Sequence, residues 1–289
     1  MNISVRVLGT AQDGGIPQIG CSCLNCRSAR QDPKRQRHPS SLLVTDPSGP
    51  THVLLDCTWR LPEQLSLAND RLRDQLPHCV LLTHAHIGHY AGLFYLGREI
   101  MGATRVPVMC TPAMAEFLRT NSPWQGLIDW NHIVLETLTP GKDFALSPNL
   151  TGRAFVVPHR GEYTDTVGYL ISGPRKGLLY IPDLDGWEGF VPTFNELAVK
   201  ADYIFIDGTF ATASELTEMT GRIYQTVPHP PIRETMRRLA DREIQVDSAQ
   251  VLFTHFNHSN PIIRPGHPLA ETLEAKGLTL AHDGDTFPL

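Results

Sequence analysis

Thr83-His84-Ala85-His86-Ile87-Gly88-His89-Tyr90 is the stretch of this sequence that says most about its architecture. Three imidazoles fall within six residues, directly after the apolar run Val80-Leu81-Leu82. Neutral imidazole is the commonest side-chain ligand of metal ions, and a strand that ends in such a turn can aim several rings at one point. The spacing is denser than a polar loop acquires by accident, so we expect a metal site here.

Composition restricts the class of protein. The 289 residues are 41% hydrophobic and 19% charged, which is enough apolar material for a sizeable core. The net charge is −5, and no run of Lys and Arg is long enough to form a nucleic-acid patch. The N-terminus lacks the apolar region of a signal peptide, and no apolar run approaches membrane-spanning length. We expect a soluble cytoplasmic protein that acts on a small molecule, and we leave a homodimer open.

Short apolar runs that end at Gly, Pro, Asn or Asp recur along the chain and are expected to be strands. Helical segments are expected between some of them, near residues 61–76, 91–101, 112–120, 192–200, 232–241 and 268–275. This mixture predicts an α/β (α+β) fold in which two sheets stack face to face and helices cover the outside. No linker rich in Pro, Gly and Ser divides the chain, so we expect a single domain over residues 1–289.

Further candidate ligands come directly after apolar runs. His159 follows Ala154-Phe155-Val156-Val157-Pro158, and Asp183 follows Leu179-Tyr180-Ile181-Pro182. His255 follows Val251-Leu252-Phe253-Thr254. Each alone is compatible with an ordinary loop residue. Because the end of a buried strand presents side chains from a rigid edge, the three together with the histidine motif indicate one site.

The order of these residues resembles the metallo-β-lactamase superfamily over nearly the whole chain. Within it, two segments, Gly9-Thr10-Ala11-Gln12-Asp13-Gly14-Gly15-Ile16-Pro17-Gln18 and Thr254-His255-Phe256-Asn257-His258-Ser259-Asn260-Pro261, resemble the PqqB family of pyrroloquinoline quinone (PQQ) biosynthesis. The first of them, with the cysteines that follow it, is also similar to the PhnP phosphodiesterases. The resemblance implies a four-layered αββα sandwich with metals at one edge of the paired sheets.

The resemblance also implies two metal positions. His84, His86 and His159 would form the first, with Asp183 bridging to a second that keeps His89 and His255. The superfamily motif His-x-His-x-Asp-His has an aspartate where this chain has Gly88. An anionic oxygen helps to hold a second divalent ion, so we expect that ion to be weak or absent. The alternative is that Asp13 or Asp56 reaches in to replace the missing carboxylate.

Cys21-x-Cys23-x-x-Cys26 predicts a metal site of a different kind. In a chain without a signal peptide, three cysteines this close together indicate zinc rather than disulfides. The similarity to PhnP implies His258, three residues after His255, as the fourth ligand. A Cys₃His site has no open coordination position, so this Zn²⁺ would be structural. The remaining residues Cys57, Cys79 and Cys110 lie in or beside apolar runs and are expected to be buried.

The resemblance implies a metal-dependent hydrolase of a small phosphodiester or ester, with one or two Zn²⁺, Mn²⁺ or Fe²⁺ ions in the pocket. Bound water would then act as the nucleophile. Asp183 would orient it, and His229, a candidate hydrogen-bond partner of Asp207, would donate a proton to the leaving group. The alternative is an iron-dependent oxidative enzyme, or an accessory or carrier protein, in PQQ biosynthesis. A histidine-rich site with one carboxylate and open positions is similar to a non-haem iron centre.

Overall fold

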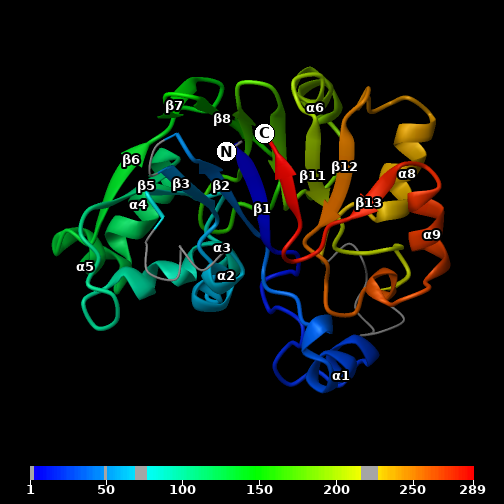
Figure 1. Ribbon diagram of the computed structural model, residues 1–289, viewed down its shortest axis with the longest axis horizontal. Helices are drawn as coiled ribbons and strands as arrows, with labels where there is room; N and C mark the ends of the chain where they lie inside the picture. The colour runs from blue at the N-terminus through cyan, green and yellow to red at the C-terminus, as the bar shows by residue number, and fades with distance from the viewer. Residues whose placement is uncertain (1–2, 49–50, 69–76, 216–226) are drawn as a thin grey trace.

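Two seven-stranded sheets face each other at the centre of the computed structural model, which describes residues 3–48, 51–68, 77–215 and 227–289 (Figure 1). The first has the order β14-β1-β2-β3-β4-β5-β6 and the second β13-β12-β11-β10-β9-β8-β7. The strands of the first are β1 (Ser4–Gly9), β2 (Ser41–Asp46), β3 (Thr51–Leu55), β4 (Cys79–Leu81), β5 (Val106–Cys110), β6 (Ile133–Thr137) and β14 (Thr286–Pro288). Those of the second are β7 (Asp143–Ser147), β8 (Leu150–Val156), β9 (Val167–Ser172), β10 (Gly177–Ile181), β11 (Tyr203–Asp207), β12 (Gln250–Thr254) and β13 (Leu278–Leu280).

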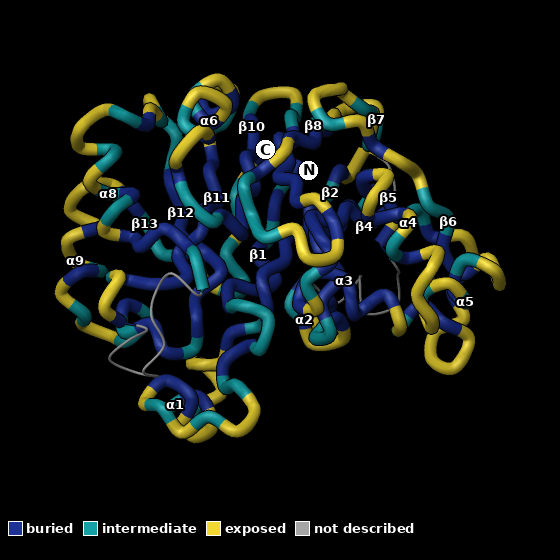
Figure 2. Tube along the Cα trace, turned by 180° about the vertical axis from the view of Figure 1, so that it is seen from behind, coloured by how far each residue is buried: buried dark blue, intermediate teal, exposed yellow. Residues whose placement is uncertain are grey.

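Helices cover the outer face of each sheet. On the first sheet lie α2 (Leu61–Ala68), α3 (Ile87–Tyr90), the 3-10 helix η2 (Ala91–Leu96), α4 (Pro112–Thr120) and α5 (Trp124–Asp129). On the second lie α6 (Val191–Ala198), α8 (Ile232–Ala240) and α9 (Pro268–Glu274). α1 (Leu24–Gln31) stands apart from both helical layers (Figure 1). Two further 3-10 helices are η1 (Pro33–Arg35) and η4 (Pro261–Ile263). The strands are mostly buried, whereas the helices expose their outer surfaces (Figure 2).

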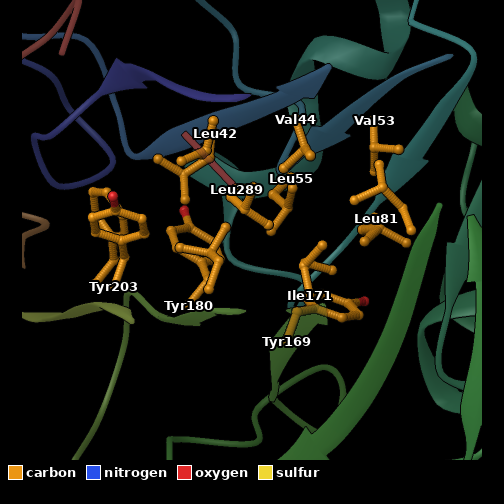
Figure 3. Packing of buried hydrophobic residues seen from close by; sticks show 14 of the residues in the cluster. Leu42, Val44, Val53, Leu55, Leu81, Tyr169, Ile171, Tyr180, Tyr203 and Leu289 are labelled. Atoms are coloured by element: carbon orange, nitrogen blue, oxygen red, sulfur yellow. The ribbon is translucent and has the colours of Figure 1, made fainter. Parts of the chain in front are cut away.

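The strands alternate between two cores. In β2, Leu42 and Val44 point between the sheets, and Leu43 points to the helices of the first sheet. In β10, Tyr180 points between the sheets, and Leu179 points to the helices of the second. Figure 3 shows the two sets of inward side chains meeting. Because successive strand residues face opposite sides, a strand buried on both faces must be apolar throughout.

The four-layered αββα architecture predicted from the sequence is confirmed. One helix differs from the prediction: residues 91–101 form only the 3-10 helix Ala91–Leu96. The helical turns end at Gly97, whose backbone is extended, and Gly92 packs so closely against the loop after β3 that a Cβ there would lie 2.0 Å from the Thr58 carbonyl oxygen. The second half of the helix expected over 61–76 lies outside the described residues. Within the described chain, no helix combines the length and apolar character needed to cross a membrane.

Candidate metal centre

The predicted pocket ligands follow the carboxyl ends of strands at one edge of the paired sheets. β3 to β6 run parallel to one another, and so do β10 to β13. The carboxyl ends of parallel strands meet at one edge, which is where α/β sheets bind ligands. His84 follows β4, Asp183 follows β10 and His255 follows β12. His159 follows β8, which has the direction of β10 because both are antiparallel to β9.

One cluster consists of His84, His86, His159 and Asp183, whose ligand atoms lie within 4.8 Å of one another. His159 Nε2 is 3.1 Å from His86 Nδ1 and 3.5 Å from Asp183 Oδ1. The ring centroids of His84 and His86 are 4.5 Å apart. Three imidazoles and a carboxylate that converge in this way fit a divalent ion such as zinc, manganese or iron.

A second cluster, which consists of His89, His255 and Asp183, shares Asp183 with the first. Asp183 Oδ2 lies 3.1 Å from His89 Nε2 and 3.3 Å from His255 Nε2, whereas Oδ1 faces His159. The two oxygens of Asp183 therefore face different groups of histidines, which is the arrangement of a carboxylate that bridges two ions. The Nε2 atoms of His84 and His255 are buried and make no hydrogen bond with any described residue. Both nitrogens are thus available to an ion.

Four of the histidine rings have an oxygen atom behind Nδ1, which is a hydrogen-bond partner for three of them and an ion-pair contact for His159. The atom near each Nδ1 is Thr83 Oγ1 at 2.9 Å for His84, Asp56 Oδ2 at 2.8 Å for His89, Asp185 Oδ1 at 2.7 Å for His159 and Thr209 Oγ1 at 3.0 Å for His255. Such partners fix the ring and direct Nε2 towards a metal. Asp56 therefore lies behind His89 and is not placed to replace the carboxylate that Gly88 lacks.

His86 is oriented the other way round. Its Nε2 atom lies 3.1 Å from Glu162 Oε2, and its Nδ1 atom faces His159. Nδ1 is therefore the nitrogen of His86 that faces the cluster, whereas Nε2 of His159 faces His86 and Nε2 of His84 has no hydrogen-bond partner among the described residues.

The charges of the pocket suit a cation. Burial lowers the pKa of His84 and of His255, which keeps both imidazoles in the neutral form that binds metals. Burial alone would raise the pKa of Asp183, but the neighbouring His255, His89 and His159 hold it well below its usual range. Asp183 is therefore an ionised carboxylate among imidazoles, which is a suitable donor set for a divalent ion.

His229 belongs to a further group of possible ligands, with Asp183, Asp207 and His255, whose ligand atoms lie within 4.8 Å of one another. It is fully buried, and its ring centroid is 5.7 Å from that of His159 and 5.8 Å from that of His255. The hydrogen bond expected between His229 and Asp207 is present, with Nδ1 2.6 Å from Oδ2. Burial would lower the pKa of His229, but the Asp207 carboxylate outweighs that effect and raises it. His229 is thus placed to hold or move a proton next to the pocket.

Cys21, Cys23, Cys26 and His258 form a separate cluster, with their ligand atoms within 4.8 Å of one another. His258 Nδ1 is 3.2 Å from Cys21 Sγ and 3.6 Å from Cys23 Sγ. The backbone N–H of Cys23 donates to Cys21 Sγ, and that of Cys26 donates to Cys23 Sγ. Three sulfurs and one imidazole nitrogen fit a closed tetrahedral zinc site. The other cysteines, Cys57, Cys79 and Cys110, are buried as expected, and none of the six forms a disulfide.

An open cleft of about 590 Å³ adjoins the histidine motif. Its described lining consists of Gln12, Asp13, Gly14, Gln18, Ile19, Trp59 and Ile87. Ile19 and Ile87 are exposed there although both are large and apolar. The lining has aromatic, aliphatic and amide groups and includes no Lys or Arg, so it suits a substrate with an apolar or aromatic part.

Sequence reasoning missed the residues that hold the ligands in place. Asp185, Thr209 and Glu162 each contact a histidine from outside the clusters. For Asp185 a signal existed, because it lies two residues beyond Asp183 on the same segment. Glu162 and Thr209 have no spacing that distinguishes them from ordinary loop residues.

Comparison with known proteins places the chain in a family. Residues 51–286 match the model of the beta-lactamase superfamily domain. The chain is 29% identical to coenzyme PQQ synthesis protein B of Azoarcus sp. (strain BH72), over 99% of this chain and 100% of that protein. A crystal structure of Zn²⁺-bound PqqB from Methylobacterium extorquens superposes with a TM-score of 0.82 at 25% identity, covering 99% of this chain and 100% of that one. A diphosphatase of the PhnP family has the same fold, with a TM-score of 0.69 at 22% identity over 100% of this chain and 98% of that one. This chain therefore belongs to the beta-lactamase superfamily and has PqqB proteins among its relatives.

Proposed function

We propose that this chain is a metal-dependent enzyme of the PqqB type, with a role in the biosynthesis of a quinone cofactor such as PQQ. The observation that carries the proposal is the match to coenzyme PQQ synthesis protein B along essentially the whole of both chains. The PqqB structure also superposes better than the PhnP-family diphosphatase, with TM-scores of 0.82 and 0.69.

The cleft supports the same proposal. A precursor of a quinone is aromatic, and Trp59 with Ile19 and Ile87 offers a surface for a flat apolar group. No Lys or Arg is among the described residues that line the cleft, although the Arg60 guanidinium stacks on Trp59, 4.5 Å from the ring centroid.

The chain's own residues would do the following work. His84, His86, His159 and Asp183 would hold a divalent ion, and His89 and His255 would contribute to a second. Such an ion would supply Lewis-acid or redox chemistry when bound. His229, held by Asp207, would exchange a proton with the substrate, and the cleft beside Ile87 would orient the substrate towards the histidines.

A hydrolase of a small phosphodiester or ester is the second candidate. It is favoured by the bridging position of Asp183, because two ions on a shared carboxylate are a common device for activating water. The buried pair His229–Asp207 would then protonate the leaving group.

One set of measurements distinguishes the two candidate functions. The chain is expressed in a PQQ-producing bacterium from which its own PQQ synthesis protein B has been deleted, and PQQ is quantified. We expect production to return, to be lost with His84→Ala, and to persist with His78→Ala, an exposed histidine outside the clusters. In parallel, the purified protein loaded with Zn²⁺, Mn²⁺ or Fe²⁺ is assayed on bis(p-nitrophenyl) phosphate. If no PQQ is produced, and the purified protein has phosphodiesterase activity that disappears in His84→Ala, the hydrolase becomes the better supported function.

A further inference from the structure

We propose that Asp13, in the loop after β1, supplies the carboxylate of the second metal position, taking the place of the motif aspartate that Gly88 replaces. The inference rests on the metal centre of the proposed function. It concerns which residue completes that centre, and it holds whether the chemistry is oxidative or hydrolytic.

Asp13 faces the ligands of the second cluster. Its Oδ1 atom lies 3.6 Å from His89 Nε2, and the ligand atoms of Asp13, His89 and His255 lie within 4.8 Å of one another. His255 Nε2 is buried and makes no hydrogen bond within the described residues. With Asp183 Oδ2, which lies 3.1 Å from His89 Nε2, the position has two imidazoles and two carboxylates around it. That donor set suits a divalent ion.

Gly88 is what allows Asp13 to be there. The backbone N–H of Gly88 donates to Asp13 Oδ1 at 3.1 Å. A Cβ at residue 88 would lie 2.1 Å from Asp13 Oδ1 and 2.7 Å from Asp13 Cα. The second contact is with backbone and cannot be relieved by rotating a side chain. A side chain at residue 88 and Asp13 in its present position therefore exclude each other. The lack of an aspartate at residue 88 is what makes room for the Asp13 carboxylate.

The loop that carries Asp13 is fixed independently of any ion. Trp59 Nε1 donates to the Asp13 carbonyl oxygen at 2.8 Å. The Gln12 N–H donates to the Phe256 carbonyl oxygen at 2.9 Å, which joins the loop to the segment that bears His255. Asp13 and His255 are thus held on two joined segments, and the carboxylate is preorganised for binding.

This geometry revises the expectation of a weak second ion. That expectation assumed only two neutral imidazoles and a shared carboxylate around the ion. A further carboxylate offsets more of the charge of the second ion and the repulsion between two ions. We therefore expect two pocket ions per chain in addition to the zinc of the cysteine cluster.

The test compares Asp13→Asn with the unmodified protein and with a control variant, Glu63→Gln. The control removes an exposed carboxylate of helix α2 that forms an ion pair with Arg60. Each protein is stripped of metal and titrated with Zn²⁺ by calorimetry, and bound metal is counted after dialysis. In Asp13→Asn we expect the second pocket ion to bind about tenfold or more weakly. The affinity for the first pocket ion should be unchanged. In protein loaded with Co²⁺ in place of zinc, the thiolate-to-Co²⁺ absorption of the cysteine cluster should also be unchanged.

Gly88→Ala provides an independent test because it removes no ligand. The added methyl group should displace Asp13 and weaken the second ion as Asp13→Asn does. Gly186→Ala, where a Cβ meets no atom within 4 Å, should leave both ions unchanged. Two equally tight pocket ions in either Asp13→Asn or Gly88→Ala would overturn the role of Asp13. Absence of any pocket ion in the unmodified protein would instead refute the metal centre on which the proposed function depends.

Discussion

Asp46 is a single buried carboxylate that connects the two sheets. It ends β2 in the first sheet and accepts a hydrogen bond from Ser147 Oγ at the end of β7 in the second, at 2.6 Å. Ser48 and Asn149 also donate to it. Burial alone would raise the pKa of Asp46, but the hydrogen bonds from Ser147, Ser48 and Asn149 lower it to about 2.

Asp46 should therefore stabilise the fold in a pH-dependent way. Because its folded-state pKa is depressed, its contribution is complete above the unfolded value of about 3.9 and is lost as the pH falls towards about 2. Asp46→Asn should lower the free energy of unfolding by about 1–2 kcal/mol at pH 6. Urea unfolding of both proteins at pH 6 and pH 2.5 checks this. The difference between them should shrink at the lower pH, and a constant difference would contradict the assignment.

Asp185 should control the first metal position without binding the ion itself. It lies 2.7 Å from His159 Nδ1, on the side of the ring away from the cluster. Removing its negative charge in Asp185→Asn should weaken orientation of that ring and lower the affinity for the first pocket ion by about ten- to a hundredfold. Zn²⁺ competition with a chelator measures the change. Asp241→Asn, which changes an exposed carboxylate at the C-terminal end of α8, serves as the control. Equal affinities in Asp185→Asn and the unmodified protein would rule out this role.

At the level of elements, the strands that could be predicted from the sequence are those made of continuous apolar runs. β10 and β12 are buried on both faces and could be recognised, and the ligands that follow them could be named. β7 and β14 were missed because their residues are largely half-buried or exposed. The position of Asp13 could be offered only as an alternative. Its contact with Gly88 joins residues 75 positions apart, and no local spacing encodes it.

Helix α4, which packs on the first sheet, is capped by the residue that precedes it. Thr111 Oγ1 accepts a hydrogen bond from the Met114 N–H at 3.2 Å and so caps the helix, whose Met114, Ala115 and Leu118 are buried. Thr111→Ala removes this cap and also the hydrogen bond that Thr111 Oγ1 donates to Asp165 Oδ1. It should therefore lower the free energy of unfolding by about 1 kcal/mol or more, and Thr111→Ser should restore most of it. Thr120→Ala, at the exposed end of the same helix, should have little effect in the same urea titration. A cost as small for Thr111→Ala as for Thr120→Ala would contradict the capping role.

In the whole molecule, the N-terminal loop and the segment after β12 form one unit that carries two sites. The Phe256 N–H donates to the Thr10 carbonyl oxygen at 2.8 Å. Asn25 Nδ2 donates to the carbonyl oxygens of His258 and Asn260, at 3.0 and 2.7 Å. The same two segments supply the cysteine cluster at one end and Asp13 with His255 at the other. The structural zinc would therefore hold in place the two segments that complete the second pocket position.

Loss of the cysteine cluster should lower the affinity of the pocket for metal ions. Cys23→Ser should remove about one zinc per chain and destabilise the fold, since binding of a structural zinc contributes folding free energy. It should also weaken the second pocket ion more than the first, because Asp13 and His255 lie on the loosened segments, whereas His84 and His86 lie on the loop after β4. Metal counting and Zn²⁺ titration below the melting temperature check this, with Cys79→Ala as a buried cysteine outside the cluster. Unchanged zinc content would remove the structural site. Loss of that zinc with both pocket affinities retained would show that the two sites are independent.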